Sequence, residues 1–225
     1  MAMKTVDASK GKLRGTYIAI LIPLGVAINL VGGQVAGRLG LPLFLDSIGT
    51  AIVAAIMGPY VGAISGVLFN IIGSIIGGNI MASLFGICNL ATAFIVGFMV
   101  RFGKFKTVLH IVIAIVAVAL ANALLGAPIA VVVYGGIQGS GVDLVVAGLL
   151  AFGNDILSAA FLARIPVNLV DKGIAVLIAW LILRRLPSTM QNLAGKKLGK
   201  AALEEPAAGE QAAGEKAEDN SAKTE

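Results

Sequence analysis

Long apolar runs, broken at intervals by short polar or glycine- and proline-containing segments, dominate the chain from residue 17 to residue 187. An apolar run of about 20 residues is long enough to cross the hydrocarbon core of a bilayer as a helix. The pattern therefore predicts an all-α membrane protein with six transmembrane helices. The predicted helices cover residues 17–36, 48–57, 60–77, 80–100, 107–133 and 165–187.

The segment before the short second helix, Arg38–Leu45, contains a glycine and a proline. It predicts an outer loop that caps the helices by folding back onto the protein. Asp46 and Ser47 follow this loop and are the predicted N-cap of the helix that begins at Ile48.

Leu144–Ala163 is apolar enough to span, but a Gly-Asn-Asp tripeptide at 153–155 interrupts it. Lys and Arg gather on the cytoplasmic side of membrane proteins. If this segment spanned, Arg184 and Arg185 would lie outside the cell. We therefore interpret it as an outer, lateral or re-entrant segment before the last helix, which leaves both termini in the cytoplasm and the protein in the plasma membrane.

The two ends of the chain differ from its centre. Residues 1–16 are basic and predict a cytoplasmic flank to the membrane domain at 17–187. A signal peptide is the alternative, but the apolar run exceeds a typical h-region of about 7–15 residues and no clear cleavage site follows. Residues 188–225, which are rich in Ala, Glu, Lys and Gly, predict a disordered cytoplasmic tail.

Composition agrees with a membrane protein, since 58% of residues are hydrophobic and 13% are charged, against about 25% charged in soluble domains. The net charge of +5 follows from basic residues near the helix ends, and it indicates membrane topology and not nucleic-acid binding. The chain has one cysteine and one histidine and lacks P-loop, HExxH, CxxC and GxSxG motifs. We expect no enzyme, no metal and no cofactor, which leaves binding, transport or channel functions.

Three polar residues share one face of the last predicted helix, namely Asn168, Asp171 and Lys172. Ionisable groups at membrane depth cost about 2.5–3.5 kcal/mol each on insertion scales, so they usually face protein or a watery cavity. They predict a binding site near the outer end of this helix. The competing interpretation is that Asp171 and Lys172 neutralise each other, Lys172 reaches the headgroups and Asn168 caps the helix.

Four motifs occur in order along the chain: Asn29-Leu-Val-Gly-Gly, Leu41-Pro-Leu-Phe-Leu-Asp-Ser-Ile-Gly-Thr, Met57-Gly-Pro-Tyr-Val-Gly-Ala and Asn168-Leu-Val-Asp-Lys-Gly. Together they resemble the substrate-binding S components of energy-coupling factor (ECF) transporters, over about residues 16–187. The resemblance implies a membrane protein that captures a vitamin-like micronutrient, a precursor or a nucleoside-like solute outside the cell. Its partners would be a membrane coupling subunit and two cytoplasmic ATPases.

The resemblance also implies where the ligand binds, namely the loop after the first helix and helices four to six. The corresponding positions here are Gln34, Asp46, Asn89, Asn122, Asn168, Asp171 and Lys172, with Tyr134 and Gln138 as lid candidates. Few aromatic residues are expected near the pocket.

The family's first helix offers an Ala-x-x-x-Ala surface to the coupling subunit. Ala19 and Pro23 stand at the corresponding positions here, and Gly25 is a further candidate for this docking surface. Two other functions stay open: a stand-alone secondary transporter that uses Asp171 as a proton or ion site, and a structural subunit that binds no solute.

Overall fold

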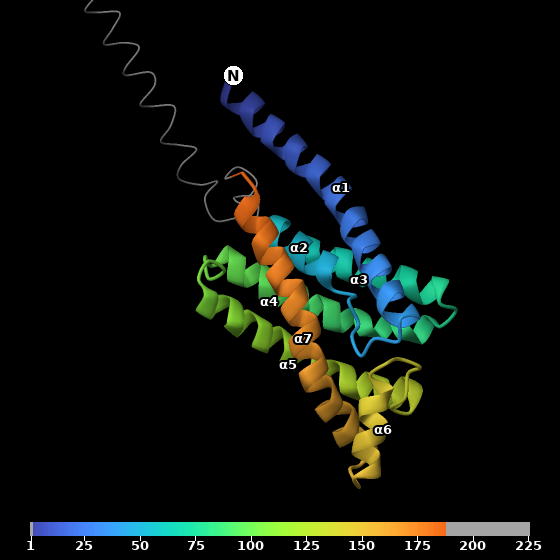
Figure 1. Ribbon diagram of the computed structural model, residues 1–225. Coiled ribbons are helices and arrows are strands. Elements are labelled where there is room, and N and C mark those ends of the chain that lie inside the picture. Colours follow the sequence, from blue (N-terminus) through green and yellow to red (C-terminus); the bar gives the residue numbers. More distant parts are fainter. Residues whose placement is uncertain (1, 188–225) are drawn as a thin grey trace, which may run out of the picture.

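The computed structural model describes the backbone of residues 2–187 and the side chains of residues 15–187. The predicted tail at 188–225 and the basic side chains before Gly15 lie outside this described part. Within it the chain is all helical, as predicted (Figure 1). The helices are α1 (Ala2–Arg38), α2 (Ile48–Met57), α3 (Pro59–Ile76), the 3-10 helix η1 (Ile80–Phe85), α4 (Gly86–Arg101), α5 (Val108–Tyr134), α6 (Asp143–Ala151) and α7 (Ile156–Arg185).

Five helical segments are long and apolar enough to cross a membrane, which supports a multi-pass membrane protein. They are Gly15–Arg38, Pro59–Ile76, Ile80–Arg101, Val108–Tyr134 and Ile156–Arg185. The remaining predicted span, α2, has only ten residues. At 1.5 Å per residue it rises about 15 Å, which is half the thickness of a hydrocarbon core.

Helix α2 lies at the centre of the bundle although it is short. Every residue from Gly49 to Met57 is buried, and the helix packs against α1, α3, α4 and α7. Small residues make this packing possible: a Cβ atom on Gly62 would lie 2.5 Å from the Cβ of Ala54, and one on Gly49 would overlap the carbonyl oxygen of Gly25. Close backbone approach between small residues is the usual basis of helix association in membranes.

The start of α2 is capped from another helix. Asn29 Oδ1 in α1 accepts a hydrogen bond from the Gly49 N–H at 2.7 Å, and Asn29 Nδ2 donates to Thr50 Oγ1 at 2.8 Å. Ser47 occupies the N-cap position, but its side chain makes no capping hydrogen bond. The predicted N-cap position and the start of α2 at Ile48 are thus confirmed, although the side chains of Asp46 and Ser47 bind Lys172 of α7 and not the N–H groups of α2.

The predicted boundary of the last helix was also wrong. Leu144–Ala163 is not one segment, because α6 ends at Ala151 and α7 begins at Ile156. Asp155 causes this break by capping α7: its carboxylate accepts hydrogen bonds from the Leu157 and Ser158 N–H groups, both at 3.0 Å. Helix α7 then continues through Pro166 and is nine residues longer at its start than predicted.

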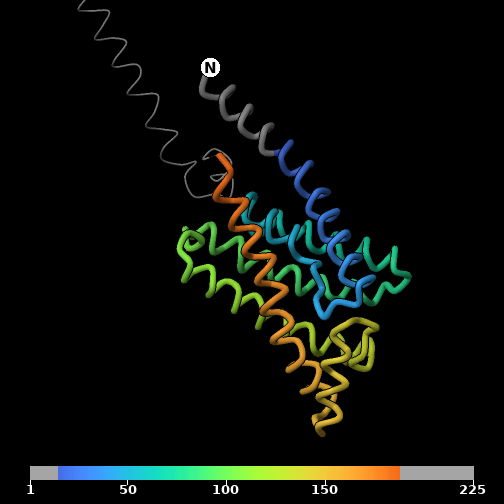
Figure 2. The backbone as a smooth tube through the Cα atoms, viewed as in Figure 1, coloured from blue at the N-terminus to red at the C-terminus, as the bar shows by residue number. Residues whose placement is uncertain are grey.

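Helices α5 and α7 are antiparallel, since Gly126 lies beside Arg164 and Gly173 lies beside Ile115. The basic turn after α4 and the basic end of α7 therefore lie at the same end of the bundle. Figure 2 shows the first coloured residues of α1 and the end of α7 toward the same side, with α6 and the start of α7 on the opposite side. The polar hollow described next lies toward the α6 side.

Candidate functional site

A cavity of about 480 Å³ lies between the ends of α1, α3, α5 and η1, the loop before α2, and the first half of α7. Its wall is formed by Leu30, Gly33, Gln34, Phe44, Asp46, Phe69, Asn70, Gly73, Ser74, Gly77, Asn79, Ala82, Phe85, Cys88, Asn122, Gly126, Tyr134, Gln138, Ser140, Arg164, Asn168 and Lys172. This volume lies within the range of about 300–1,000 Å³ typical of small-molecule sites.

Most of the residues predicted to bind a ligand line this cavity. Those in the wall are Gln34, Asp46, Asn122, Tyr134, Gln138, Asn168 and Lys172. Asn89 and Asp171 are not in the wall, and both are buried behind it. Both are hydrogen-bonded to the loop before α2, so their contact with a ligand stays a prediction that the lining of the cavity does not support.

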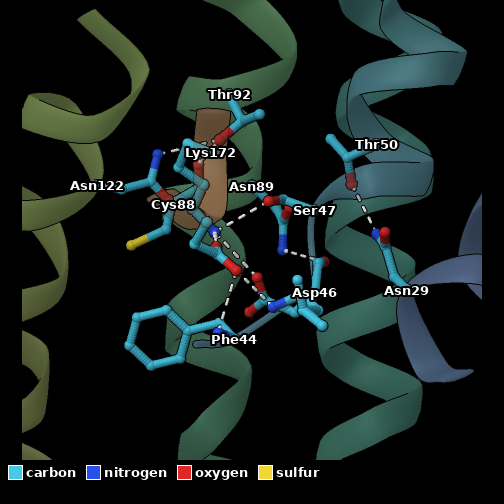
Figure 3. Close-up of polar contacts among 12 residues, drawn as sticks. Asn29, Phe44, Asp46, Ser47, Thr50, Cys88, Asn89, Thr92, Asn122 and Lys172 are labelled. Carbon is cyan, nitrogen blue, oxygen red and sulfur yellow. Dashed lines mark hydrogen bonds and ion pairs between the residues drawn. The ribbon is translucent and has the colours of Figure 1, made fainter. Parts of the chain in front are cut away.

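Lys172 is the centre of an ionic cluster at the deep end of the cavity (Figure 3). Its Nζ atom donates to Asp46 Oδ1 at 3.0 Å and to Ser47 Oγ at 2.9 Å. It also lies 2.7 Å from Asp171 Oδ2, in an ion pair outside hydrogen-bonding geometry. An ammonium has three donors, and two of them are used in hydrogen bonds to the segment before α2, while the charge is also balanced by Asp171.

Asp171 ties α7 to the loop before α2. Its Oδ1 atom accepts hydrogen bonds from the N–H groups of Phe44 at 3.1 Å and Leu45 at 2.6 Å. Leu45 has a φ of 52°, a left-handed conformation that is uncommon for a residue other than glycine. The same arrangement places the Phe44 ring 5.7 Å from Lys172 Nζ, within the range of a cation–π contact. The loop is thus hydrogen-bonded to α7 through Asp171.

This geometry changes the roles assigned to the charged residues. Lys172 and Asp171 hold the loop in place and are not available to a ligand in the way the sequence suggested. Asp46 is the more accessible member, with 26% of its side chain exposed. Its Oδ2 atom accepts no hydrogen bond from the described residues, so the cluster presents one carboxylate oxygen to the cavity.

Two asparagines support the wall from α4 and α5. Asn122 Nδ2 donates to Thr92 Oγ1 at 3.0 Å and to the Val118 carbonyl oxygen at 2.9 Å, which links the two helices. Asn89 Nδ2 donates to the Asp46 carbonyl oxygen at 3.4 Å. Of the two, Asn122 alone reaches the cavity, where its Oδ1 atom is an acceptor without a partner among the described residues.

The lid candidates lie at the mouth of the cavity. Asn79 Nδ2 donates to Tyr134 Oη at 3.1 Å, and the Tyr134 ring stacks on Phe85 with centroids 6.3 Å apart. The loop that carries Gln138 is held by Asp143, whose carboxylate accepts hydrogen bonds from successive backbone N–H groups of residues 138–140. The loop that contributes Gln138 to the wall is therefore bonded to the start of α6.

Asn168 is the wall residue most clearly prepared for a ligand. It is 2% exposed and lines the cavity, and its amide makes no hydrogen bond to any residue that the structure describes. Its amide oxygen and nitrogen are therefore free to bond a solute in the cavity. Its position in the middle of α7 excludes the interpretation as a helix cap.

Arg164 was missed because the last helix was predicted to begin at Ile165, nine residues after its observed start and one residue after Arg164. Arg164, Asn168 and Lys172 are spaced by four residues on α7 and all line the cavity. This spacing places side chains on one helix face and was the signal available in the sequence. Phe69 and Phe85 were missed as well, and with Phe44 and Tyr134 they give the wall more aromatic surface than predicted.

The predicted docking residues on α1 divide into two groups. Ala19 and Pro23 are exposed and stay candidates for a partner contact. Gly25 is buried, and a Cβ atom there would lie 2.5 Å from Ser65 Oγ and 2.7 Å from Val53 Cγ2. Its proposed role in docking was wrong, because α2 and α3 already occupy that surface.

The described residues contain no group of three or more His, Cys, Asp or Glu side chains arranged to hold a metal ion. In comparisons with protein-family models, with curated proteins and with solved structures, nothing matches this chain. The function is therefore argued from the site itself.

Proposed function

We propose that this protein is the substrate-binding subunit of an ECF-type importer. In this role it captures a small polar micronutrient outside the cell for ATP-driven uptake by a membrane coupling subunit and two cytoplasmic ATPases. The observation that carries the proposal is the 480 Å³ cavity into which Asn168 presents an amide without a protein partner. Polar groups and aromatic rings share its wall, as they do in sites for small heterocyclic solutes.

The orientation of the cavity supports capture from outside. The cavity lies at the end of the bundle opposite the basic turn after α4 and the basic end of α7. Positive residues favour the cytoplasmic side, so the mouth would open to the exterior and both termini would lie inside. The proposed topology has six helices in the membrane, with α2 as a short central helix surrounded by longer ones.

The alternative of a stand-alone ion- or proton-coupled transporter relied on Asp171. That carboxylate is 1% exposed; its Oδ1 atom accepts hydrogen bonds from two backbone N–H groups, and its Oδ2 atom forms an ion pair with Lys172. A coupling site must exchange its ion with water during each cycle. A carboxylate enclosed in this way suits a structural role better, which favours a binding subunit.

Ligand binding is tested by thermal shift of the purified full-length protein against a panel of vitamins, nucleosides and nucleobases. We expect at least one compound to raise the melting temperature. Asn168→Ala should weaken its binding by about 1–3 kcal/mol, since the ligand group loses its partner. Asn154→Ala is the matched control, because Asn154 lies at the α6–α7 turn outside the cavity. Unchanged affinity in Asn168→Ala would place the site elsewhere.

Energy coupling is tested by uptake of the identified ligand in cells with and without the ATPase and coupling subunits. Uptake should require those subunits, whereas binding to this chain should not. Uptake that persists without any ATPase would contradict the assignment to an ECF importer and favour the secondary transporter.

A further inference from the structure

Arg164 is a buried cation that the fold does not use. It is 2% exposed and lies in the cavity wall beside Gly126 of α5. Its Nη1 atom donates to the Ala160 carbonyl oxygen of its own helix at 3.1 Å, whereas its Nη2 atom is buried and has no hydrogen-bond partner. This bond lies within one turn of α7, so the guanidinium makes no hydrogen bond that joins two helices.

The surrounding carboxylates do not compensate this charge. No Asp or Glu among the described side chains lies within 4.0 Å of the guanidinium, whereas Lys172 on the same helix face has two. Asp143 is near enough to interact with Arg164 electrostatically, but its carboxylate is bonded to backbone N–H groups of residues 138–140. An unpaired guanidinium inside a membrane protein is costly, and such groups mark substrate or ion sites.

The charges of the cavity are divided between its two ends. Asp46, Asp171 and Lys172 form a cluster with a formal charge of −1 at the deep end, and Arg164 supplies +1 two helical turns nearer the mouth. Eight residues of helix separate Lys172 from Arg164, a rise of about 12 Å. The deep end thus presents a carboxylate oxygen of Asp46, and the other end presents guanidinium donors together with the amide of Asn168.

We infer that the natural ligand carries a carboxylate that binds Arg164, with Asn168 one turn deeper as a neighbouring donor. This inference rests on the proposed binding function and names the class of solute. A guanidinium matches the planar geometry of a carboxylate. A phosphate, with a charge near −2, would need more positive charge than the one unpaired cation in the described wall. The Asp46 oxygen at the other end suits an amine or ring N–H of the same ligand.

The probes are two pairs of small, near-isosteric compounds, nicotinate with nicotinamide and benzoate with benzamide. In each pair only the charge and donor pattern of one group differ. Thermal shift and titration on the full-length purified protein should show that each acid binds about 10- to 100-fold more tightly than its amide, the range expected for a charge-assisted hydrogen bond. Equal binding of acid and amide by the wild-type protein would overturn the inference, and this comparison requires no variant.

Variants then assign the effect to one residue. Arg164→Gln should remove the preference for the acid, and Arg164→Lys should keep part of it, because the charge stays but the planar fork is lost. Arg38→Gln is the matched control, since Arg38 is exposed at the end of α1 and outside the cavity wall. A preference for the acid that survives in Arg164→Gln, or disappears in Arg38→Gln, would contradict the assignment.

The same experiment separates this inference from the proposed function. If neutral compounds of the wider panel bind in a manner that depends on Asn168 while acids show no advantage, the pocket function stands and the carboxylate inference fails. If no compound of the panel binds, the proposed function itself fails.

Discussion

Lys172 and Arg164 are two buried cations on one face of the same helix, and their surroundings are opposite. Lys172 contacts two carboxylates and a hydroxyl, which hold the loop before α2 against α7. Among the described residues, the Arg164 guanidinium makes one hydrogen bond, to a carbonyl oxygen of its own helix. Burial alone therefore does not distinguish a structural charge from a binding charge. The number of hydrogen-bond and ion-pair partners from other parts of the chain differs between the two cations, and this difference is the basis for proposing a structural role for Lys172 and a ligand-binding role for Arg164.

The largest expected effect comes from Lys172→Met. This change leaves Asp46 and Asp171 as neighbouring carboxylates with no cation between them, and breaking a buried ion pair on one side costs about 3–5 kcal/mol. Equilibrium unfolding in mixed micelles measures the loss. The double variant Lys172→Met with Asp171→Asn should recover part of it, because one of the two unpaired charges is removed. A Lys172→Met variant as stable as the wild type would contradict a structural role for Lys172.

Asp171→Asn should have a smaller effect, about 1.5–3 kcal/mol, which is the range for hydrogen bonds to charged groups. An amide oxygen still accepts from the Phe44 and Leu45 N–H groups, and Lys172 keeps Asp46 as a partner. The same unfolding measurement applies. A loss as large as that of Lys172→Met would mean that Asp171, and not Lys172, is the centre of the cluster.

Arg164→Gln should change the stability of the ligand-free protein by about 1 kcal/mol, the central value for point substitutions, since Arg164 makes no hydrogen bond that joins two helices and one of its buried donors has no partner. The comparison with Lys172→Met then gives the expected contrast between the two cations. Severe destabilisation by Arg164→Gln without ligand would show that Arg164 supports the fold after all.

The smallest effect on stability is expected for Asp155, an exposed carboxylate that caps the start of α7. Hydrogen bonds from Ser158 and from the backbone hold the pKa of this carboxyl below its usual value. The ionised form therefore stabilises the fold above the ordinary pKa of about 3.9, and this contribution is lost as the pH falls through the lowered value.

Asp155→Asn keeps the cap without the charge, so its melting temperature should lie slightly below that of the wild type near pH 6. The two proteins should converge as the medium is acidified toward pH 3. A gap that widens on acidification would contradict the sign of this shift.

The sequence predicts the helices well because apolar runs of membrane length have few alternatives. The face that carries Asn168 and Lys172 was also visible, because polar residues at a spacing of four stand out in an apolar helix. The prediction of these two positions required only the local periodicity of the helix, and both residues line the cavity.

The features that could not be predicted from the sequence are those that depend on contacts between distant segments. The hydrogen-bond partners of Lys172, Asp46 and Ser47, lie about 125 residues earlier in the sequence. A pairing over this distance leaves no periodic pattern in the sequence from which it could be predicted. Arg164 was lost through a helix boundary, because Asp155 was taken as an interruption and not as the cap of a longer helix. Gly25 was assigned to a partner because its contact with α2 is visible only in three dimensions.

The central claim is a water-accessible hollow that opens away from the basic end of the bundle. It is tested most directly by cysteine labelling at two serines of α3 in a Cys88→Ala background. Ser74 lines the cavity, whereas Ser65 is sealed between α3 and α1, where it donates to the Ile22 carbonyl oxygen. Both residues are buried, so burial is matched between the two positions.

A membrane-impermeant anionic methanethiosulfonate applied to right-side-out vesicles should modify Ser74→Cys and leave Ser65→Cys unmodified, as read by mass spectrometry. Modification of Ser74→Cys only in inverted vesicles, or in neither orientation, would contradict the account.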